Sequence, residues 1–277
     1  EILIGLVGSE MCIRDRYDVL KEIPHCFTTR SGGVSQGAQS SLNMSFSRES
    51  SKKNVLENYR RVAEALPVSF EKMTHVPQLH GDHVLTVTAK EVGVGIVKPY
   101  PEGMETFGYD AMITNVPGAV LCTLHADCVP VLLYDPEQNA VAAIHSGWRG
   151  TVLKIAEKTV GKMEQCYGTS PEDLMAVICP SIGIDRFETD GDVLEAFQNS
   201  FGILTEDKSL VYKKKNKYHI SVSGFVYRTL LAVGLKSEHI FYDTRCTYEE
   251  DTLFFSHRRD KGNTGAMSAV IATRSGV

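Results

Sequence analysis

The feature that most constrains the fold of this chain is a block of four short apolar runs between residues 111 and 144. The runs are divided by turn-forming pairs, Pro117-Gly118 and Asp135-Pro136. Apolar runs of this length between turns are typical of buried strands. The block therefore predicts the middle of a β-sheet. The four runs cover residues 111–114, 119–124, 129–134 and 140–144.

Helical patterns occur on both sides of this block. Apolar residues recur at spacings of three and four in 54–66 and again in 151–166, which predicts two helices with one buried face each. Helices and strands alternate irregularly, and no repeat or linker divides the chain, so we expect an α+β fold, a single domain with mixed β-sheets flanked by helices. The other expected elements are a strand at 84–89, a loop or hairpin at 93–108, a strand at 174–179, helices at 193–201 and 222–233, a charged hairpin at 212–220, and strands at 240–242, 253–255 and 267–272.

Composition narrows the class of partner. The net charge is −5, and the longest run of like charge is the three lysines at 213–215, which argues against binding to nucleic acid or to an anionic membrane. The apolar runs are far shorter than the roughly 18 residues of a membrane helix. We therefore expect a small-molecule partner. Residues 17–277 are expected to form the domain, and 1–16 to be non-native or disordered, because 9–16 has no helical or strand periodicity.

Cysteine usage and the first residues bear on location. The seven cysteines are an odd number without a tight pairing pattern, which indicates reduced thiols. The apolar start lacks the basic region and the cleavage site of a secretory signal. We therefore expect a cytoplasmic protein.

Thiol and imidazole groups lie at the ends of the predicted central strands. Cys128 precedes one apolar run, His145 ends the next, and His80 precedes the strand expected at 84–89. Three Cys and His ligands with a fourth position open are typical of a catalytic zinc site, so these residues form a candidate zinc site. A nucleophilic Cys128 and a Cys128 that is only a small core residue are the alternatives. His125 is a rival donor, although its side chain would point to the opposite face if the strand continues through it.

Four further polar residues are candidate substrate-binding groups. Arg149 comes just before a predicted helix, where it is placed to bind an anion together with helical N–H groups, or to form an ordinary ion pair. Arg30 and Asn43 lie in a Gly- and Ser-rich segment that predicts a loop. Ser181 follows a predicted strand and offers a hydroxyl to a ligand or a cap to a helix.

Several motifs, in this order, resemble those of the bacterial laccase-domain family. This family is also called the multicopper polyphenol oxidase or purine nucleoside phosphorylase family, and it is related to the peptidoglycan editing factor. The resemblance extends from about Pro24 to the C-terminus, and departs from the family's pattern at 184–187. The matching motifs are Phe27-Thr-Thr-Arg-Ser-Gly-Gly-Val-Ser, Ser41-Leu-Asn, Gln78-Leu-His-Gly, Ala126-Asp-Cys-Val-Pro, His145-Ser-Gly-Trp-Arg-Gly, Pro180-Ser-Ile-Gly and Phe254-Phe-Ser-His-Arg-Arg-Asp.

The resemblance implies a zinc site and active site at His80, Cys128 and His145. It implies phosphorolysis of adenosine, inosine, guanosine and S-methyl-5'-thioadenosine, with adenosine deamination as a second reaction. We expect a monomer or a homodimer. Zinc-activated water accounts for deamination. Phosphorolysis requires a cradle for phosphate, for which Arg149 or Arg30 is the candidate.

Three competing functions remain. A copper-dependent phenol oxidase would need His clusters that nine scattered histidines do not supply, although copper stays an alternative metal. A cysteine hydrolase would use Cys128 as nucleophile on a peptidoglycan precursor. A non-enzymatic ligand-binding or scaffold protein would not depend on His80.

Overall fold

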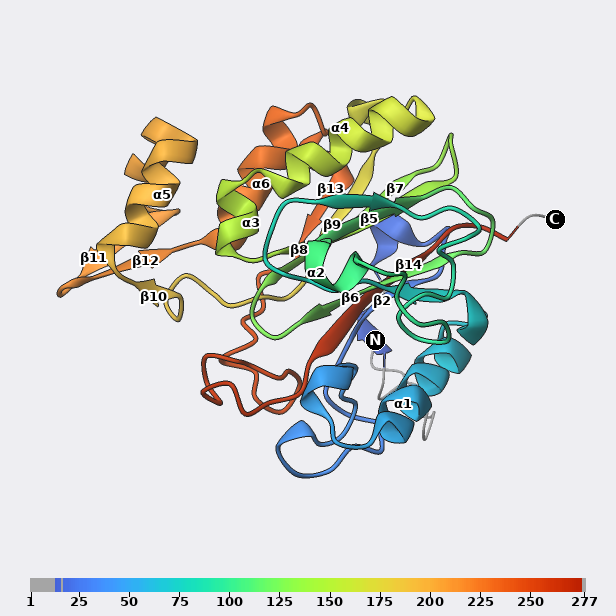
Figure 1. Cartoon of the computed structure of the whole chain (residues 1–277). Helices are drawn as coiled ribbons and strands as arrows, with labels where there is room; N and C mark the ends of the chain where they lie inside the picture. The colour runs from blue at the N-terminus through green and yellow to red at the C-terminus, as the bar shows by residue number, and fades with distance from the viewer. Residues whose placement is uncertain (1–12, 16, 276–277) are drawn as a thin grey trace.

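The computed structural model describes residues 13–15 and 17–275 (Figure 1). The prediction for residues 1–16 concerns mainly residues 1–12 and 16, which lie outside the described residues. Within that segment Ile13–Asp15 forms strand β1, which pairs antiparallel with β2 (His25–Thr28). The expected mixed fold in a single domain is confirmed, with sheets that contain parallel and antiparallel pairs.

Two large sheets lie face to face in the middle of the molecule. The six-stranded sheet has the order β13-β9-β7-β8-β5-β4, and the five-stranded sheet has the order β1-β2-β14-β6-β3. All four central apolar runs form strands, as predicted. The strands not yet given are β3 (Met73–His75), β4 (Val84–Thr86), β5 (Ala111–Thr114), β6 (Val120–His125), β7 (Val129–Asp135), β8 (Ala140–Ser146), β9 (Met175–Ile178), β13 (Ile240–Tyr242) and β14 (Met267–Ala272).

Helices cover the outer faces of the two sheets, so the molecule has four layers (Figure 1). The helix expected at 54–66 is α1 (Lys52–Ala65), which packs on the five-stranded sheet. On the other side lie α4 (Ile155–Tyr167) and α6 (Val222–Ala232). The short helices α2 (Met104–Phe107) and α3 (Trp148–Val152) lie in connections between strands.

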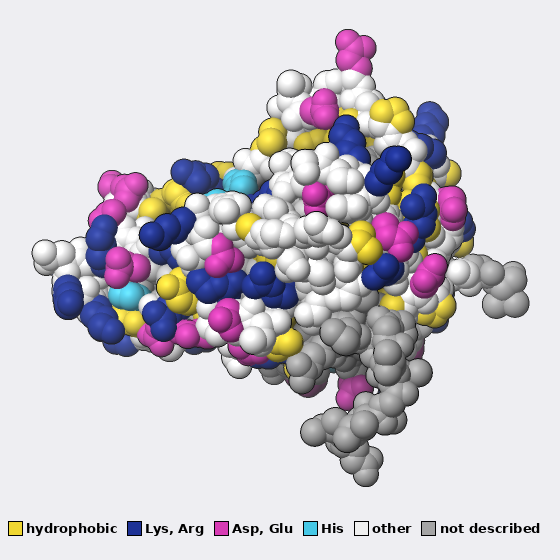
Figure 2. Space-filling view, turned by 90° about the horizontal axis from the view of Figure 1, so that it is seen from below, with side chains coloured by type: hydrophobic (Ala, Val, Ile, Leu, Met, Phe, Trp, Pro, Cys, Tyr) yellow, Lys and Arg dark blue, Asp and Glu magenta, His cyan; other side chains and the backbone are white. Residues whose placement is uncertain are grey.

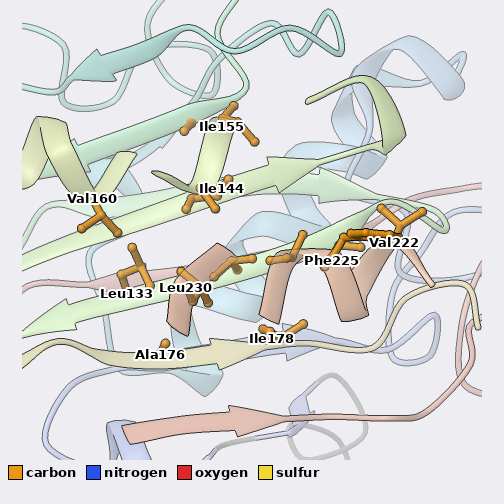
Figure 3. Packing of buried hydrophobic residues seen from close by; sticks show 14 of the residues in the cluster. Leu133, Ile144, Ile155, Val160, Ala176, Ile178, Val222, Phe225 and Leu230 are labelled. Atoms are coloured by element: carbon orange, nitrogen blue, oxygen red, sulfur yellow. The ribbon is translucent and has the colours of Figure 1, made fainter. Parts of the chain in front are cut away.

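Side chains of the central strands alternate between two cores. In β7, Leu133 faces the helices while Leu132 and Tyr134 face the five-stranded sheet. Figure 3 shows Leu133 among side chains of the helix-facing core, where Phe225 and Leu230 of α6 also lie. Burying a side chain of this size contributes about 1.5–3 kcal/mol. Both faces of the six-stranded sheet are therefore buried, which explains why its strands read as unbroken apolar runs.

A small sheet projects from this body (Figure 1). It has the order β10-β12-β11 and carries α5 (Gly191–Phe201). Its strands are β10 (Glu188–Thr189), β11 (Val211–Lys214) and β12 (Lys217–Ile220), of which the last two form the hairpin expected at 212–220.

Two local predictions were wrong. The helix expected at 151–166 is broken, because Lys154 takes a left-handed conformation with φ 63° between α3 and α4. Residues 253–255 form no strand, because the N–H groups of Leu253 and Phe254 donate to the carbonyl of Glu250 within a turn. In both cases a local backbone turn overrides an apolar pattern.

The surface agrees with the modest net charge. On the face shown in Figure 2, basic and acidic side chains are interspersed over most of the visible area. Of the helices in 17–275, none is long and apolar enough to cross a membrane.

Candidate metal centre

Three donor groups from different connections lie together at one end of the strands of the six-stranded sheet. His80 lies in the loop before β4, Cys128 directly precedes β7, and His145 lies near the end of β8. One donor atom of each residue lies within 4.8 Å of the other two. The convergence expected from the sequence is therefore present, and within the described residues this is the one His, Cys, Asp and Glu group that could hold a metal ion.

The carboxylate of Asp110 organises two of these residues. Its Oδ1 accepts a hydrogen bond from the backbone N–H of His80 at 3.0 Å and lies 2.7 Å from Nδ1 of His145. Its Oδ2 accepts the N–H groups of Leu79 and Gly81. Because Nδ1 of His145 is held by a carboxylate, Nε2 faces Cys128, as in metal sites where a carboxylate orients a ligating imidazole.

The backbone at the site passes close to the donor atoms, and two of its residues have strained conformations. His80 has φ 62° and Asp127 has φ 94°, both in the left-handed region that non-glycine residues rarely adopt. A Cβ atom at Gly147 would lie 3.1 Å from Sγ of Cys128 and 3.1 Å from Cδ2 of His80. A larger residue at 147 would therefore have to displace donor side chains by a few tenths of an ångström, so glycine suits this close approach of the Ser146–Trp148 backbone.

The Cys128 thiol and the His145 imidazole shift each other's pKa. Burial alone would raise the pKa of the Cys128 thiol, but the charge of His145 and hydrogen bonds from His145 and His80 lower it to about 6. Burial would lower the pKa of His145, but the Cys128 thiolate and Asp110 raise it to about 9. Without metal the pair is therefore a thiolate beside an imidazolium near neutral pH.

His125 supports the site without joining it. Its Nδ1 lies 3.2 Å from the carbonyl oxygen of Cys128, and its Nε2 lies 2.8 Å from Oγ1 of Thr123. Burial, followed by the charge of His145, holds its pKa well below the usual value. A neutral His125 with both ring nitrogens engaged is a structural neighbour of the donor group rather than a fourth donor.

The donor group lies on the wall of a cavity of about 1180 Å³. Ligand pockets are commonly about 300–1,000 Å³, so this cavity has room for a nucleoside and an anion together. Part of the wall is formed by residues 45–48 and by Ala266, which we call the arginine wall because it carries Arg48. We call His80, Cys128 and His145 the metal wall.

The candidate substrate-binding residues are dispersed. Arg149 lines the cavity, but it is exposed and its guanidinium lies over the Trp148 ring at 4.4 Å. The Arg30 guanidinium donates to the carbonyl oxygens of Asp251 and Ser40, outside the residues that line the cavity. Ser181 lines a separate cavity of about 290 Å³, and its carbonyl accepts the N–H of Thr247.

Asn43 is fully buried and engaged by the backbone. Its Oδ1 accepts the N–H groups of Ser45 and Ala266, and its Nδ2 donates to the carbonyl oxygen of Ser45. Asn43 therefore joins two segments that form the arginine wall and does not itself line the cavity.

Sequence reasoning missed two residues that matter at the site. Asp110 directly precedes β5, so a carboxylate at the start of an apolar run was the available signal. Arg48 is adjacent to no motif that would have singled it out. Its place on the cavity wall depends on contacts with residues near 265, far along the chain.

Fold and site together define a mixed α/β protein with a His, Cys and His donor group on the wall of a cavity of about 1180 Å³. The model of the multi-copper polyphenol oxidoreductase laccase family matches residues 24–274, and the chain belongs to this family. This result confirms the resemblance drawn from the motifs.

Named relatives and solved structures agree with this membership. Purine nucleoside phosphorylase YlmD of Bacillus subtilis is 32% identical over 254 residues, which cover 92% of this chain and 90% of that protein. A purine nucleoside phosphorylase of Bacteroides thetaiotaomicron is 36% identical over 239 residues, covering 86% of each. The crystal structure of YlmD from Geobacillus stearothermophilus superposes with a TM-score of 0.84 at 30% identity, covering 94% of each chain.

Proposed function

We propose that this protein is a zinc-dependent purine nucleoside phosphorylase that also deaminates adenosine. Its substrates are adenosine, inosine, guanosine and S-methyl-5'-thioadenosine, together with phosphate. The observation that carries the proposal is the metal wall, three donor atoms within 4.8 Å of one another on a cavity of about 1180 Å³. The names of the relatives, which match nearly the whole chain, support the same reaction.

The donor set suits zinc. One thiolate and two neutral imidazoles are ligands that zinc prefers, and three protein ligands leave a position for water or substrate. Asp110 on His145 is the kind of carboxylate partner that ligating imidazoles require. A zinc ion held by His80, Cys128 and His145 would supply Lewis-acid activation of water or of a polar substrate group, which attack at C6 of adenosine requires.

Phosphorolysis makes different demands on the chain. A phosphate oxygen attacks C1′, the bond from C1′ to the base nitrogen breaks, and the base leaves with that electron pair and takes up a proton. The products are a free purine and a sugar 1-phosphate, which is ribose 1-phosphate for adenosine, inosine and guanosine and 5-methylthioribose 1-phosphate for S-methyl-5'-thioadenosine. The cavity contributes by holding both substrates together.

The test is to purify the protein without added metal, quantify zinc and copper, and follow adenosine by chromatography with and without phosphate. We expect about one zinc per chain, adenine and ribose 1-phosphate only when phosphate is present, and inosine in either case. Absence of phosphate-dependent base release would contradict phosphorolysis. If the protein held one copper per chain and oxidised phenols, it would be a phenol oxidase and the proposal would be wrong.

A matched pair of cysteine variants controls for general damage. Cys128→Ser removes a proposed ligand, whereas Cys166→Ser removes an exposed thiol on α4 outside the cavity. Both reactions should be lost in the first variant and kept in the second. Equal loss in both would point to unfolding and not to the site.

A second candidate function is favoured by one observation. Asp110, His145 and Cys128 form a carboxylate, imidazole and thiol series in which the thiol pKa is lowered to about 6, as in cysteine hydrolases. An amide hydrolase acting on peptidoglycan precursors would keep its activity after zinc is removed with dipicolinate and lose it on alkylation with iodoacetamide. The phosphorylase would lose activity in both treatments.

We keep the remaining expectations as part of the proposal. The enzyme acts in the cytoplasm as a monomer or homodimer, on small molecules and not on nucleic acid or membranes. Copper is the alternative metal, because two imidazoles and a thiolate also suit copper.

A further inference from the structure

Hydrogen bonds within the arginine wall hold Arg48 in place at the cavity. Asn43 holds Ser45 and Ala266 through its side chain, and the N–H of Met44 donates to the carbonyl oxygen of Ala266. Nη1 of Arg48 then donates to the carbonyl oxygen of Gly265 at 2.9 Å. Gly265 packs closely on the Phe255 ring, since a Cβ there would lie 2.7 Å from the ring. The guanidinium is therefore anchored at one nitrogen.

The charge of Arg48 is left without a paired carboxylate. In 13–15 and 17–275, the Gly265 carbonyl is the acceptor found for this side chain, and no ion pair involves it. Arg48 is half-buried, and burial lowers the pKa of its guanidinium while the charges of Cys128 and Asp127 raise it. A guanidinium remains protonated under such shifts, so a positive charge is held close to the metal wall.

The other cations on the cavity wall are less available to a ligand. The Arg258 guanidinium donates to the carbonyl oxygens of Arg186 and Glu188, and Nζ of Lys98 donates to that of Val92. Arg149 is exposed and stacked on Trp148. Lys52 also lines the cavity but is exposed. Arg48 alone among these five cations combines partial burial with a nitrogen anchored on the backbone.

We propose that Arg48 binds the phosphate co-substrate in the cavity, and that Asn43 is the positioning residue that holds Arg48 there. This inference rests on the proposed phosphorylase function. A guanidinium presents parallel N–H donors that match two oxygens of one phosphate, and its charge offsets that of the dianion. The phosphate would then approach C1′ from the arginine wall while the nucleoside lies against the metal wall.

The test is steady-state phosphorolysis of inosine with phosphate varied at saturating inosine, and the reverse. Arg48→Gln should raise the KM for phosphate by about 10- to 100-fold, the range for losing charge-assisted hydrogen bonds. The KM for inosine and the zinc content should stay near those of the wild type. Arg48→Lys should recover part of the loss, because a lysine keeps the charge without the paired donors.

Lys53→Gln on α1 is the matched control, since it removes a charge from an exposed residue that does not line the cavity. Its phosphate KM should be unchanged. An Arg48→Gln enzyme with wild-type KM for phosphate would overturn the inference, as would equal increases in the KM values of phosphate and inosine.

Direct binding separates this inference from the proposed function. Titration calorimetry with inorganic phosphate should give a binding signal for the wild type that Arg48→Gln weakens about 10-fold or more. If the wild type binds phosphate through Arg48 but releases no base, the proposed function fails and the anion site stands. If the wild type phosphorolyses inosine and Arg48→Gln binds phosphate normally, the site is elsewhere.

Discussion

The metal wall and the arginine wall of the cavity are built in different ways. The metal wall takes two of its residues from the ends of neighbouring strands, and one carboxylate, that of Asp110, fixes both His80 and His145. The arginine wall comes from a short 3-10 helix, Phe46–Arg48, and from loop residues on either side of the chain contact, Ser45 and Ala266, which the buried amide of Asn43 ties together. In the metal wall, the pairing of the strands fixes where the donor residues lie. In the arginine wall, the position of Arg48 depends on a few hydrogen bonds between segments far apart in the sequence.

The comparison predicts that the two walls separate metal binding from phosphate binding. The largest effect is expected for Cys128→Ala, which should lower phosphorolysis by about a thousandfold, because a metal centre contributes several kcal/mol to the reaction. Zinc content should fall in parallel, as measured by mass spectrometry of the metal. Phosphate binding measured by calorimetry should remain, and its loss would show that the walls are not separate.

A smaller effect is expected from Asp110→Asn. The amide keeps the shape of the carboxylate, but its NH₂ group cannot accept the N–H groups that Oδ2 receives from Leu79 and Gly81. Zinc affinity should fall by about 10- to 100-fold, the usual cost of losing a carboxylate partner of a ligating imidazole. Competition with a chromophoric chelator measures it, and unchanged affinity would mean that Asp110 does not position the donors.

The metal wall was the more predictable of the two. Cys128 and His145 could be placed together because strand ends that pair in one sheet bring adjacent residues into contact, and His80 preceded a recognisable strand. Asp110 gave one local signal, a carboxylate at the start of an apolar run, but its contacts with His80 and His145 could not be predicted from it. Arg48 could not be predicted, because its place depends on a contact with a segment that no local pattern links to it. The layered sheets were likewise predictable from apolar runs, while the break at Lys154 required a backbone conformation that the helical pattern concealed.

A pH effect is expected from His75, which lines the cavity but belongs to neither wall. Burial, and then the charge of His145, lowers its pKa to about 4. The unfolded chain takes up this proton near pH 6.5 and the folded chain near pH 4, so stability present above 6.5 is lost as the pH falls through this window. The loss attributable to His75 should be about 1–2 kcal/mol between pH 6.5 and pH 5.

Urea unfolding at pH 7 and pH 5 measures this dependence. His75→Gln has no titrating group, so its free energy of unfolding should change less between these two pH values than that of the wild type. The same change in both proteins would assign the acid sensitivity to other buried histidines, such as His125.

The smallest effect is expected from Arg149→Gln. Arg149 is exposed at the cavity, where water and salt screen its charge, so the KM for phosphate should change by less than about threefold, and only at low ionic strength. Kinetics at two salt concentrations test this. A change as large as that of Arg48→Gln would place the phosphate near Arg149, and would remove the distinction between the arginine wall and the rest of the cavity.

The position of β14 has a consequence for how the protein is made. This strand is hydrogen-bonded to β2 on one side and β6 on the other, although both neighbours lie far upstream of it. During translation β2 and β6 emerge well before residues 267–272, so the five-stranded sheet can close only once that late segment has left the ribosome. Until then the backbone N–H and C=O groups that β14 will pair are exposed on both upstream strands, open to chaperones or to other nascent chains.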